Sequence, residues 1–338
     1  MGTMYDVHIG RLLNGKRKLE GEGAYLICVP GQQSYRAESL EGITGKYISA
    51  KDIEDLLYQY CRESIEEFVE TEYNDDVYTF SLFTDSSNGS YLVYINNLET
   101  LRCNVDETFE RYQQQYKDSG DKYYNRTEEQ VYREYKFAEG DHLFCYEELP
   151  GELERVLQVY SRVSYEQTID EDLGQTYVLD ASLIDSQMYL IALKVLERLQ
   201  TDWGKLKRTV DFIAYVSSSD GDGGDYLTLS TLMRKSVVQD RLYQAVPELR
   251  EKDEAFHNFV HAVQEKPLVD QVKTWLAVIE GGEFGDNSMR SFLRTDYDAY
   301  EQLLLLGKAA VPALEAELDH SESEDSQELI RQVLEDLK

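Results

Sequence analysis

The sequence predicts an α+β protein in which an antiparallel or mixed sheet carries helices on one face and an all-helical cap follows. Three observations indicate this fold class. Short alternating apolar runs are typical of strands, amphipathic runs with a spacing of three to four residues lie between them, and only helical patterns follow residue 250. With 338 residues, 42% of them apolar, the chain is long enough for two or three domains with their own cores.

These patterns divide the chain into a β-rich N-terminal segment (1–48), an α+β domain (49–249) and a helical domain (250–338). In the first segment, Tyr5 to Ile9 alternates as a strand does, and Ala24 to Val29 is an apolar run that Pro30-Gly31 closes. The N-terminal segment is therefore expected to contain short strands joined by turns.

A helix over 50–71 opens the α+β domain. Ser49 precedes it as an N-cap, and Asp52 at the third helical position completes a capping box. One buried stripe is formed by Ile53, Leu56, Leu57, Tyr60, Cys61, Ser64 and Phe68.

A β-hairpin is predicted next. Residues 77–83 and 91–95 form its strands, and the turn over 85–90 contains Asn88-Gly89, a pair that tolerates positive φ. Asn96 or Asn97 then caps a helix over 98–117.

The rest of the domain alternates loops, helices and strands. The polar stretch 118–130 indicates a loop, and 132–137 is predicted as a third strand. Further along, the expected elements are helices over 151–161 and 181–199, a buried strand over 210–216 and a solvated loop over 217–225.

The tail is predicted to be helical throughout. A helix over 253–265 is followed by one that starts at Pro267 and ends at Gly281-Gly282. A HEAT-type helical repeat is resembled by two stretches: the Leu-rich stretch 300–318, which contains an Ala-Val-Pro-x-Leu motif, and the stretch 329–337. This resemblance implies stacked helices.

The charge is strongly negative and unevenly distributed. The net charge is −31, with 5 acids and 6 bases in 1–48 but 24 acids and 9 bases in 49–150. Residues 151–248 hold 16 acids and 10 bases, and 249–338 hold 20 and 9. Such a field repels nucleic acid and anionic membranes and attracts basic protein surfaces. We therefore expect a basic protein partner and no direct binding of nucleic acid.

Several segments resemble a known family. In order, they are Tyr78-Thr79-Phe80-Ser81-Leu82-Phe83-Thr84-Asp85, Asn97-Leu98-Glu99-Thr100-Leu101, Asp211-Phe212-Ile213-Ala214-Tyr215-Val216-Ser217 and Val246-Pro247-Glu248-Leu249. Together they resemble an uncharacterised bacterial domain family associated with SUKH-type immunity proteins of polymorphic toxin loci, over about 50–249. Residues 117–135 lack the tryptophan of that family. The resemblance implies a bacterial cytosolic antitoxin that binds one toxin, and it supplies no catalytic residues.

The first candidate binding surface is acidic. Glu63, Glu66, Glu67 and Glu70 share one helix face, with Arg62 as the nearest base, and Glu72, Asp75 and Asp76 extend the patch. Like charges at this spacing cost about 0.2–0.5 kcal/mol per pair. A docking surface for a basic partner is one interpretation, a solvated helix face is the other, and a metal site is a remote third.

The second candidate is aromatic. The chain has 26 tyrosines, and those expected to contact a partner are Tyr112, Tyr116, Tyr123 and Tyr124. Tyrosine suits half-exposed cores as well as binding hot spots, so both interpretations remain open.

Three other patterns indicate structure more than chemistry. Asp220, Asp222 and Asp225 in a Gly-rich turn depart from the calcium-loop pattern, and Thr231 stands where its last ligand belongs. His257 and His261 have helical zinc spacing but lack the glutamate and third ligand of a zinc enzyme. Cys28, Cys61, Cys103 and Cys145 are predicted to be buried free thiols; the alternatives are a disulfide and a metal-binding or catalytic role.

The function predicted from these features is that of a non-enzymatic immunity protein, without a cofactor, that occludes a basic toxin surface, possibly that of a nuclease. Two alternatives remain: a scaffold or regulator that uses its helical repeat face, for example in phage defence, and a hydrolase with a carboxylate site between domains. The sequence contains neither an apolar run of about 18 residues nor an N-terminal signal, so we expect a cytoplasmic protein without membrane contact.

Overall fold

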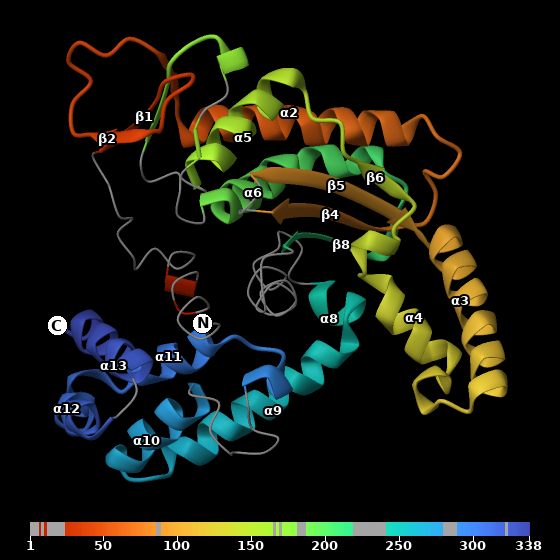
Figure 1. Cartoon of the computed structure of the whole chain (residues 1–338). Helices are drawn as coiled ribbons and strands as arrows, with labels where there is room; N and C mark the ends of the chain where they lie inside the picture. The colour runs from red at the N-terminus through yellow and green to blue at the C-terminus, as the bar shows by residue number, and fades with distance from the viewer. Residues whose placement is uncertain are drawn as a thin grey trace. The chain divides into compact units, whose positions relative to one another are not determined.

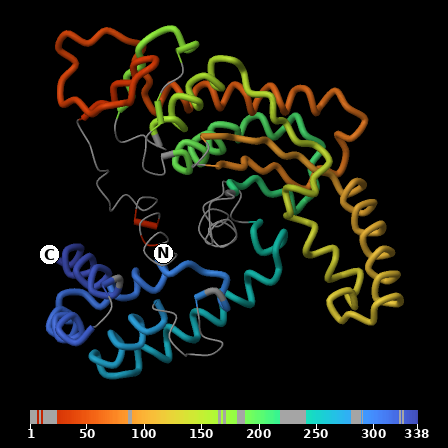
Figure 2. Tube along the Cα trace, in the orientation of Figure 1, coloured from red at the N-terminus to blue at the C-terminus, as the bar shows by residue number. Residues whose placement is uncertain are grey.

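The computed structural model describes residues 7, 10, 11, 24–85, 89–164, 167, 168, 171–180, 187–218, 241–279, 289–321 and 324–338. It confirms the α+β class: two sheets are present, and the C-terminal part is helical (Figures 1 and 2). The chain divides into two compact units. We call Glu20–Ser217 with Lys235–Arg241 the α+β unit, and Met1–Leu19, Ser218–Arg234 and Leu242–Lys338 the helical unit.

The first sheet joins N-terminal strands to a strand from much later in the chain. Its strands are β1 (Tyr25–Cys28), β2 (Tyr35–Ala37), β3 (Lys46–Ile48) and β7 (Tyr177–Asp180), in the order β2-β1-β7-β3. β1 is antiparallel to β2 and β7, whereas β3 is parallel to β7. A Cβ at Gly45 would lie 2.7 Å from the Thr176 carbonyl oxygen, so this close approach of β3 to β7 requires glycine.

The second sheet contains the predicted hairpin. Its strands are β4 (Val77–Asp85), β5 (Ser90–Asn97), β6 (Phe144–Tyr146) and β8 (Arg208–Ser218), in the order β6-β5-β4-β8. β4 and β5 are antiparallel, with Phe80 opposite Ile95. Gly89 has the expected positive φ of 60°, while residues 86–88 of the predicted turn lie outside the described residues. The predicted loop after β8 also lies outside them from residue 219 onward.

Helices cover one face of this sheet (Figure 1). They are α2 (Ala50–Val69), α5 (Gly151–Ser164) and α6 (Gln187–Arg198), with the 3-10 helix η5 (Leu199–Lys205) after α6; a further 3-10 turn, η3, spans Glu171–Leu173. The capping box of α2 is confirmed, since the Ser49 N–H donates to the Asp52 carboxylate at 2.8 Å. The Trp203 ring lies 4.8 Å from Phe80 and 5.8 Å from Phe212, centroid to centroid, which joins η5 to β4 and β8. Of the predicted helix 181–199, residues 181–186 lie outside the described part.

A helical hairpin follows β5. It consists of α3 (Leu98–Ser119), the 3-10 turn η1 (Lys122–Tyr124) and α4 (Glu128–Lys136), and the turn η2 (Glu139–Asp141) leads on to β6. Asn97 is the N-cap of α3, and Gly120 with φ 68° ends it. The predicted strand over 132–137 is wrong, because Thr127 and Gln130 form a capping box that starts α4.

The helical unit has its own core. Its helices are α8 (Leu242–Ala245), α9 (Pro247–Gln264), α10 (Leu268–Ile279), α11 (Asp296–Leu305), α12 (Val311–His320) and α13 (Glu324–Asp336), with 3-10 turns η10 (Met289–Phe292) and η11 (Gly307–Ala310). Val7 is buried in this core, and the Arg11 guanidinium forms two hydrogen bonds, of 3.0 and 2.9 Å, with Asp336. Val7 is helical, so the strand predicted over Tyr5 to Ile9 is wrong at this residue; residues 5, 6, 8 and 9 lie outside the described ones. Among the described residues, no helix combines the length and apolar character needed to span a membrane.

Candidate functional site

The four glutamates of the predicted acidic stripe are all exposed on α2, but they are not equivalent. The Glu66 carboxylate accepts hydrogen bonds from Lys205 Nζ at 2.8 Å and from Arg62 at 3.2 Å. The ammonium of Lys205 is the main reason that the pKa of Glu66 is lowered. The expectation that Arg62 is the nearest offsetting base is therefore wrong: η5 supplies a second cation, and Glu66 belongs to a structural ion pair.

An ion-pair network occupies the side of α2 that faces α6 and η5. Arg198 donates to both Glu54 and Asp55 at 2.7 Å, and Lys51 bridges the same two carboxylates. Burial would raise the pKa of Glu54, but the hydrogen bonds from Lys51 and Arg198 outweigh burial and leave it lowered. A second group of ion pairs surrounds Glu66, in which Asp202 pairs with Lys205 at 3.1 Å and with Arg62 at 3.5 Å. Lys51, Arg62, Arg198 and Lys205 are thus each engaged with a carboxylate.

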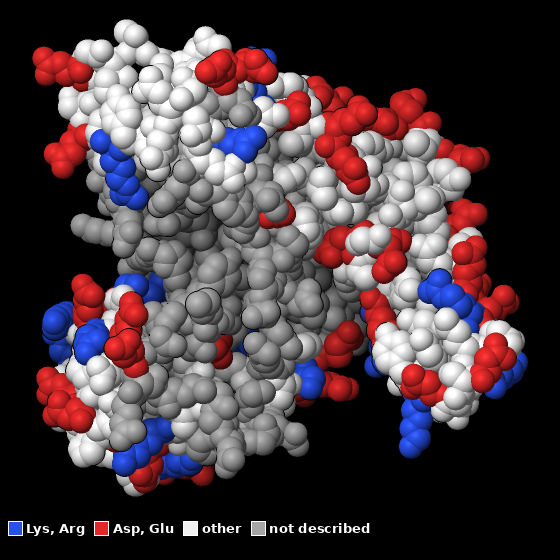
Figure 3. Space-filling model, viewed as in Figure 1, with Lys and Arg blue, Asp and Glu red and all other residues white. Residues whose placement is uncertain are grey.

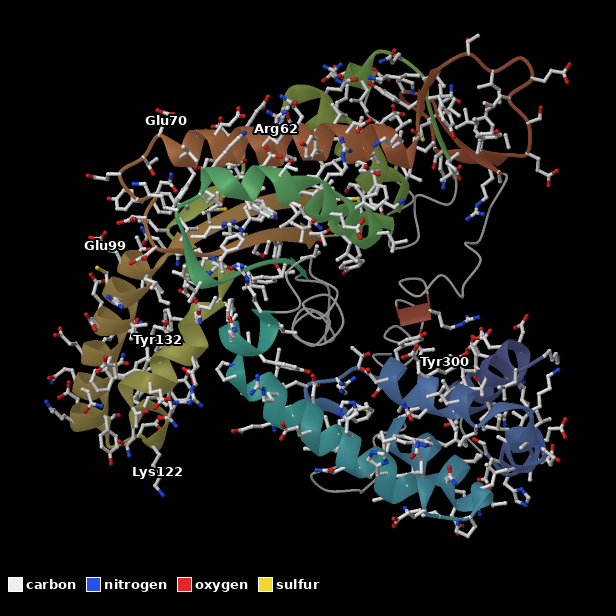
Figure 4. All side chains as sticks on the ribbon, turned by 180° about the vertical axis from the view of Figure 1, so that it is seen from behind. Arg62, Glu70, Glu99, Lys122, Tyr132 and Tyr300 are labelled. Atoms are coloured by element: carbon white, nitrogen blue, oxygen red, sulfur yellow. The ribbon has the colours of Figure 1, made fainter. Side chains whose placement is uncertain are left out.

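The opposite flank of α2 lacks such partners. We define the free acidic patch as Glu63, Glu67, Glu70, Asp75 and Asp76, which are exposed and make no ion pair with any residue that the structure describes. Glu63 accepts a hydrogen bond from the neutral Gln59 amide at 2.6 Å. Figure 3 shows a band of Asp and Glu that follows α2 and continues along α3, and Figure 4 places Glu70 at the end of α2.

A pocket extends the patch at the start of α3. It has a volume of about 240 Å³ and is lined by Asp75, Asp76, Leu98, Glu99, Arg102, Cys103 and Asp106. Asp76 adopts φ 46°, a left-handed conformation that short polar side chains tolerate, and its carbonyl accepts the Leu98 N–H at 3.1 Å. Four carboxylates and one guanidinium suit a cationic side chain of a partner. No metal-binding cluster of His, Cys, Asp or Glu occurs among the described residues.

Three of the four predicted tyrosines meet at the tip of the α3–α4 hairpin, which Lys122 marks in Figure 4. The rings of Tyr112, Tyr123 and Tyr124 lie 5.1–6.2 Å apart, centroid to centroid, and Tyr123 is 57% exposed. The Arg126 guanidinium lies 5.3 Å from the Tyr123 ring centroid. Tyr116 lies one turn beyond Tyr112 and takes no part in these ring contacts. With a rise of about 1.5 Å per residue, Tyr112 is about 20 Å along α3 from Leu98, so the predicted tyrosines and acids form two separate surfaces.

A polar cluster that sequence reasoning missed lies on the face of the second sheet away from α2. Ser81 Oγ lies 2.8 Å from Ser217 Oγ and donates to Glu139 Oε1 at 3.4 Å. Burial raises the pKa of Glu139, and hydrogen bonds from Ser217, Tyr215 and Ser81 offset this only in part. The signal available in the sequence is a serine within each of two strands, Ser81 in β4 and Ser217 in β8.

His142 lies near this cluster and is 7% exposed. Its ring centroid is 6.2 Å from that of Tyr78 and 6.1 Å from that of Tyr94. Burial lowers the pKa of His142 to about 4, and the Lys136 carbonyl acts in the opposite direction without offsetting burial. Neither ring nitrogen has a hydrogen-bond partner of normal geometry within the described part of the chain. His142 is therefore neutral at physiological pH.

The cysteines differ in exposure. All four are free thiols: Cys28 and Cys61 are buried as predicted, Cys145 is half-buried and Cys103 is exposed. The prediction of a buried thiol is wrong for Cys103 because its side of α3 lines the pocket and not the core. The predicted calcium-like turn of Asp220, Asp222 and Asp225 lies outside the described residues.

Comparison with known protein families, curated proteins and solved structures found no match to the chain.

Proposed function

We propose that the chain is a non-enzymatic acidic binding protein that acts as a bacterial immunity protein by covering a basic surface of a cognate toxin. The free acidic patch is the observation that carries this proposal. Lys205, Arg198 and Arg62 engage carboxylates on one flank of α2, while the carboxylates of the other flank have no described cation. A surface of this kind gains electrostatic energy when a basic partner supplies the missing cations.

The proposed mechanism is stoichiometric occlusion. The negative field would steer a basic toxin surface toward α2 and α3, with association rates toward 10⁸ M⁻¹s⁻¹ at low salt. The tyrosines at the hairpin tip would then slow dissociation, because aromatic side chains are common binding hot spots. If the toxin is a nuclease, a bound acidic protein also excludes its anionic substrate.

Two finer features belong to the same proposal. The helical unit is proposed to be HEAT-like, supported by the pairing of α10 with α11 and of α12 with α13. A bacterial cytoplasmic location is proposed from the resemblance to immunity-associated domains.

The structure offers a limited basis for the alternative of a hydrolase. Glu139 has the raised pKa of a general acid. The groups recorded as hydrogen-bonded to its carboxyl are its own backbone N–H and the hydroxyls of Ser217, Tyr215 and Ser81. Glycoside hydrolysis instead uses a pair of carboxyl groups that flank the scissile bond. Ser81 and Ser217 also bond to each other, which fits a role in joining β4 to β8.

The test uses the protein encoded beside this chain in its native genome. Its affinity for the chain is measured by calorimetry between 50 and 300 mM salt. Glu63, Glu67 and Glu70 are replaced together by Lys in one variant, and the matched control carries Lys at the exposed positions Glu315, Glu324 and Glu328 of the helical unit. Both variants change the net charge equally, so their comparison separates the patch from the general field.

We expect affinity to fall as salt rises and to fall about tenfold or more in the patch variant alone, since several exposed charge pairs of up to about 1 kcal/mol each are lost. Equal effects in the two variants would show that the patch is not the binding surface. A neighbouring protein that does not bind at all would refute the immunity function.

A further inference from the structure

Strand β6 lies at the edge of the second sheet. It pairs with β5 alone, with Phe144, Cys145 and Tyr146 opposite Ile95, Tyr94 and Val93. No backbone hydrogen bond joins the other side of β6 to any residue that the structure describes. An edge of this kind presents N–H and C=O groups on which another strand can pair.

Side chains from α2 and the following turn hold this edge in place. The Phe144 ring lies 4.8 Å from Phe68 and 5.1 Å from Tyr73, centroid to centroid. The Tyr60 hydroxyl donates to the Tyr146 carbonyl. These contacts anchor β6 to α2 and to the turn that follows α2. A preorganised edge lowers the entropy cost of adding a strand.

The electrostatic field at β6 is negative. Burial and then the Glu67 carboxylate raise the pKa of Tyr146 to about 12. Burial, together with the Glu147 carboxylate and against a hydrogen bond from Tyr94, raises the pKa of Cys145 to about 11. Glu147 also contributes to the raised pKa of Tyr60. No Lys or Arg contributes to any of these three shifts.

The residues beside β6 select among possible occupants. Natural edge strands are commonly protected by Lys or Pro, but here the strand continues into the exposed Glu147 and Glu148 and is preceded by Leu143, which is 58% exposed. Two copies of this edge would repel each other through their glutamates. An extended segment that carries Lys or Arg would be attracted and could also cover Leu143.

We infer that β6 receives an extended, basic segment of a protein partner as an added fifth strand of the second sheet. This inference rests on the proposed function for the basic character of the partner, and it adds the binding mode. Main-chain hydrogen bonds would supply affinity, and Glu67, Glu147 and Glu148 would select basic side chains.

The experiment uses the full chain and synthetic peptides of eight residues that alternate Lys and Val. One peptide is unmodified, two carry N-methyl groups on either the odd or the even residues, and a Glu–Val peptide is the charge control. Successive residues of a strand point their N–H groups to opposite edges. Methylation on one set of residues must therefore block pairing, while methylation on the other set leaves the pairing edge intact.

We expect the unmodified Lys–Val peptide to bind. One methylated peptide should have a dissociation constant at least tenfold higher than that of the unmodified peptide, and the other should have one within about threefold of it. Hydrogen exchange of the amides of 143–147 should slow when the peptide is bound. Replacing Glu67, Glu147 and Glu148 together by Gln should weaken binding, whereas Gln at Glu315, Glu324 and Glu328 should not.

Two results would overturn the inference: no binding of the unmodified peptide, or equal binding of both methylated peptides. If the methylated peptides bind equally but binding remains sensitive to salt and to the glutamate variant, strand addition is refuted and the acidic binding function stands. The immunity function is decided separately, by the affinity for the neighbouring protein.

Discussion

Lys205 Nζ lies 2.8 Å from the Glu66 carboxylate, and this contact removes one glutamate from an otherwise continuous acidic face. The pair joins η5 to α2. It lies between the flank of α2 whose carboxylates are paired with cations and the flank whose carboxylates are not. Replacing Lys205 by Gln leaves Arg62 as the remaining cation beside Glu66 and makes the exposed face more negative. The affinity for a basic partner should then rise about two- to fivefold, as expected for one exposed charge pair. Calorimetry at low salt measures this change, and Lys308→Gln at an exposed position of the helical unit controls for net charge.

The hairpin tip should act on dissociation. Tyr123→Ala removes the most exposed ring of the three-ring cluster, so the dissociation rate of the partner should rise about tenfold with little change in its association rate. Tyr35→Ala is a matched control because Tyr35 is 48% exposed and lies in the first sheet. Equal kinetics for both variants in surface plasmon resonance would exclude the tip from the interface.

His142 should limit stability in acid. Its pKa is about 4 in the folded chain and about 6.5 when unfolded, so the unfolded state binds the proton first as pH falls. The stability from the neutral ring is complete above about pH 6.5 and is lost progressively down to about pH 4, a total of about 3 kcal/mol. His142→Phe should reduce the loss of unfolding free energy between pH 7 and pH 4 by that amount. Urea titrations measure it, with the exposed His257→Phe as control; an unchanged loss would show that His142 is not the group responsible.

Glu139 should have the opposite pH dependence. Because burial raises its folded pKa, the carboxyl stabilises the fold while protonated, and this contribution is lost as pH rises through the folded pKa. Glu139→Gln keeps a neutral side chain of the same shape beside Ser81. We expect the variant to be more stable than the parent at pH 7 and to show no such gain at pH 4. A variant that is less stable at pH 7 would contradict this account of the cluster.

Two glycines with positive φ allow the cost of backbone strain to be measured apart from the cost of a steric clash. Gly89 has φ 60°, and a Cβ there would lie 2.8 Å from the Leu157 carbonyl oxygen; Gly120 has φ 68° with open space around it. Gly120→Ala should cost about 1–2 kcal/mol of unfolding free energy, the cost of the left-handed conformation. Gly89→Ala should cost clearly more, because α5 must also shift. Equal losses of unfolding free energy in urea titrations would mean that α5 moves away from the added methyl group at no measurable energetic cost.

Local signals predicted much of the secondary structure. The Ser49–Asp52 capping box and the spacing of apolar residues located α2, and Asn-Gly between two apolar runs located the β4–β5 hairpin. The strand predicted over 132–137 is a helix instead, because the capping box of Thr127 and Gln130 starts α4, whose apolar side packs on α3. Where local signals for a strand and for a helix are of similar strength, the outcome depends on which of the two structures can bury its apolar side chains against the rest of the fold.

The sequence by itself determined the α+β class, the helical tail and the uneven negative charge, because periodicity, caps and composition act over a few residues. Only the tertiary structure decided which acids are free. Lys205 is far from Glu66 in the chain but 2.8 Å away in the fold, and Glu139 meets Ser81 and Ser217 from three separate segments. The outer edge of β6 likewise depends on strand order. Pairing between distant segments depends on packing of the whole chain, and no local pattern encodes it.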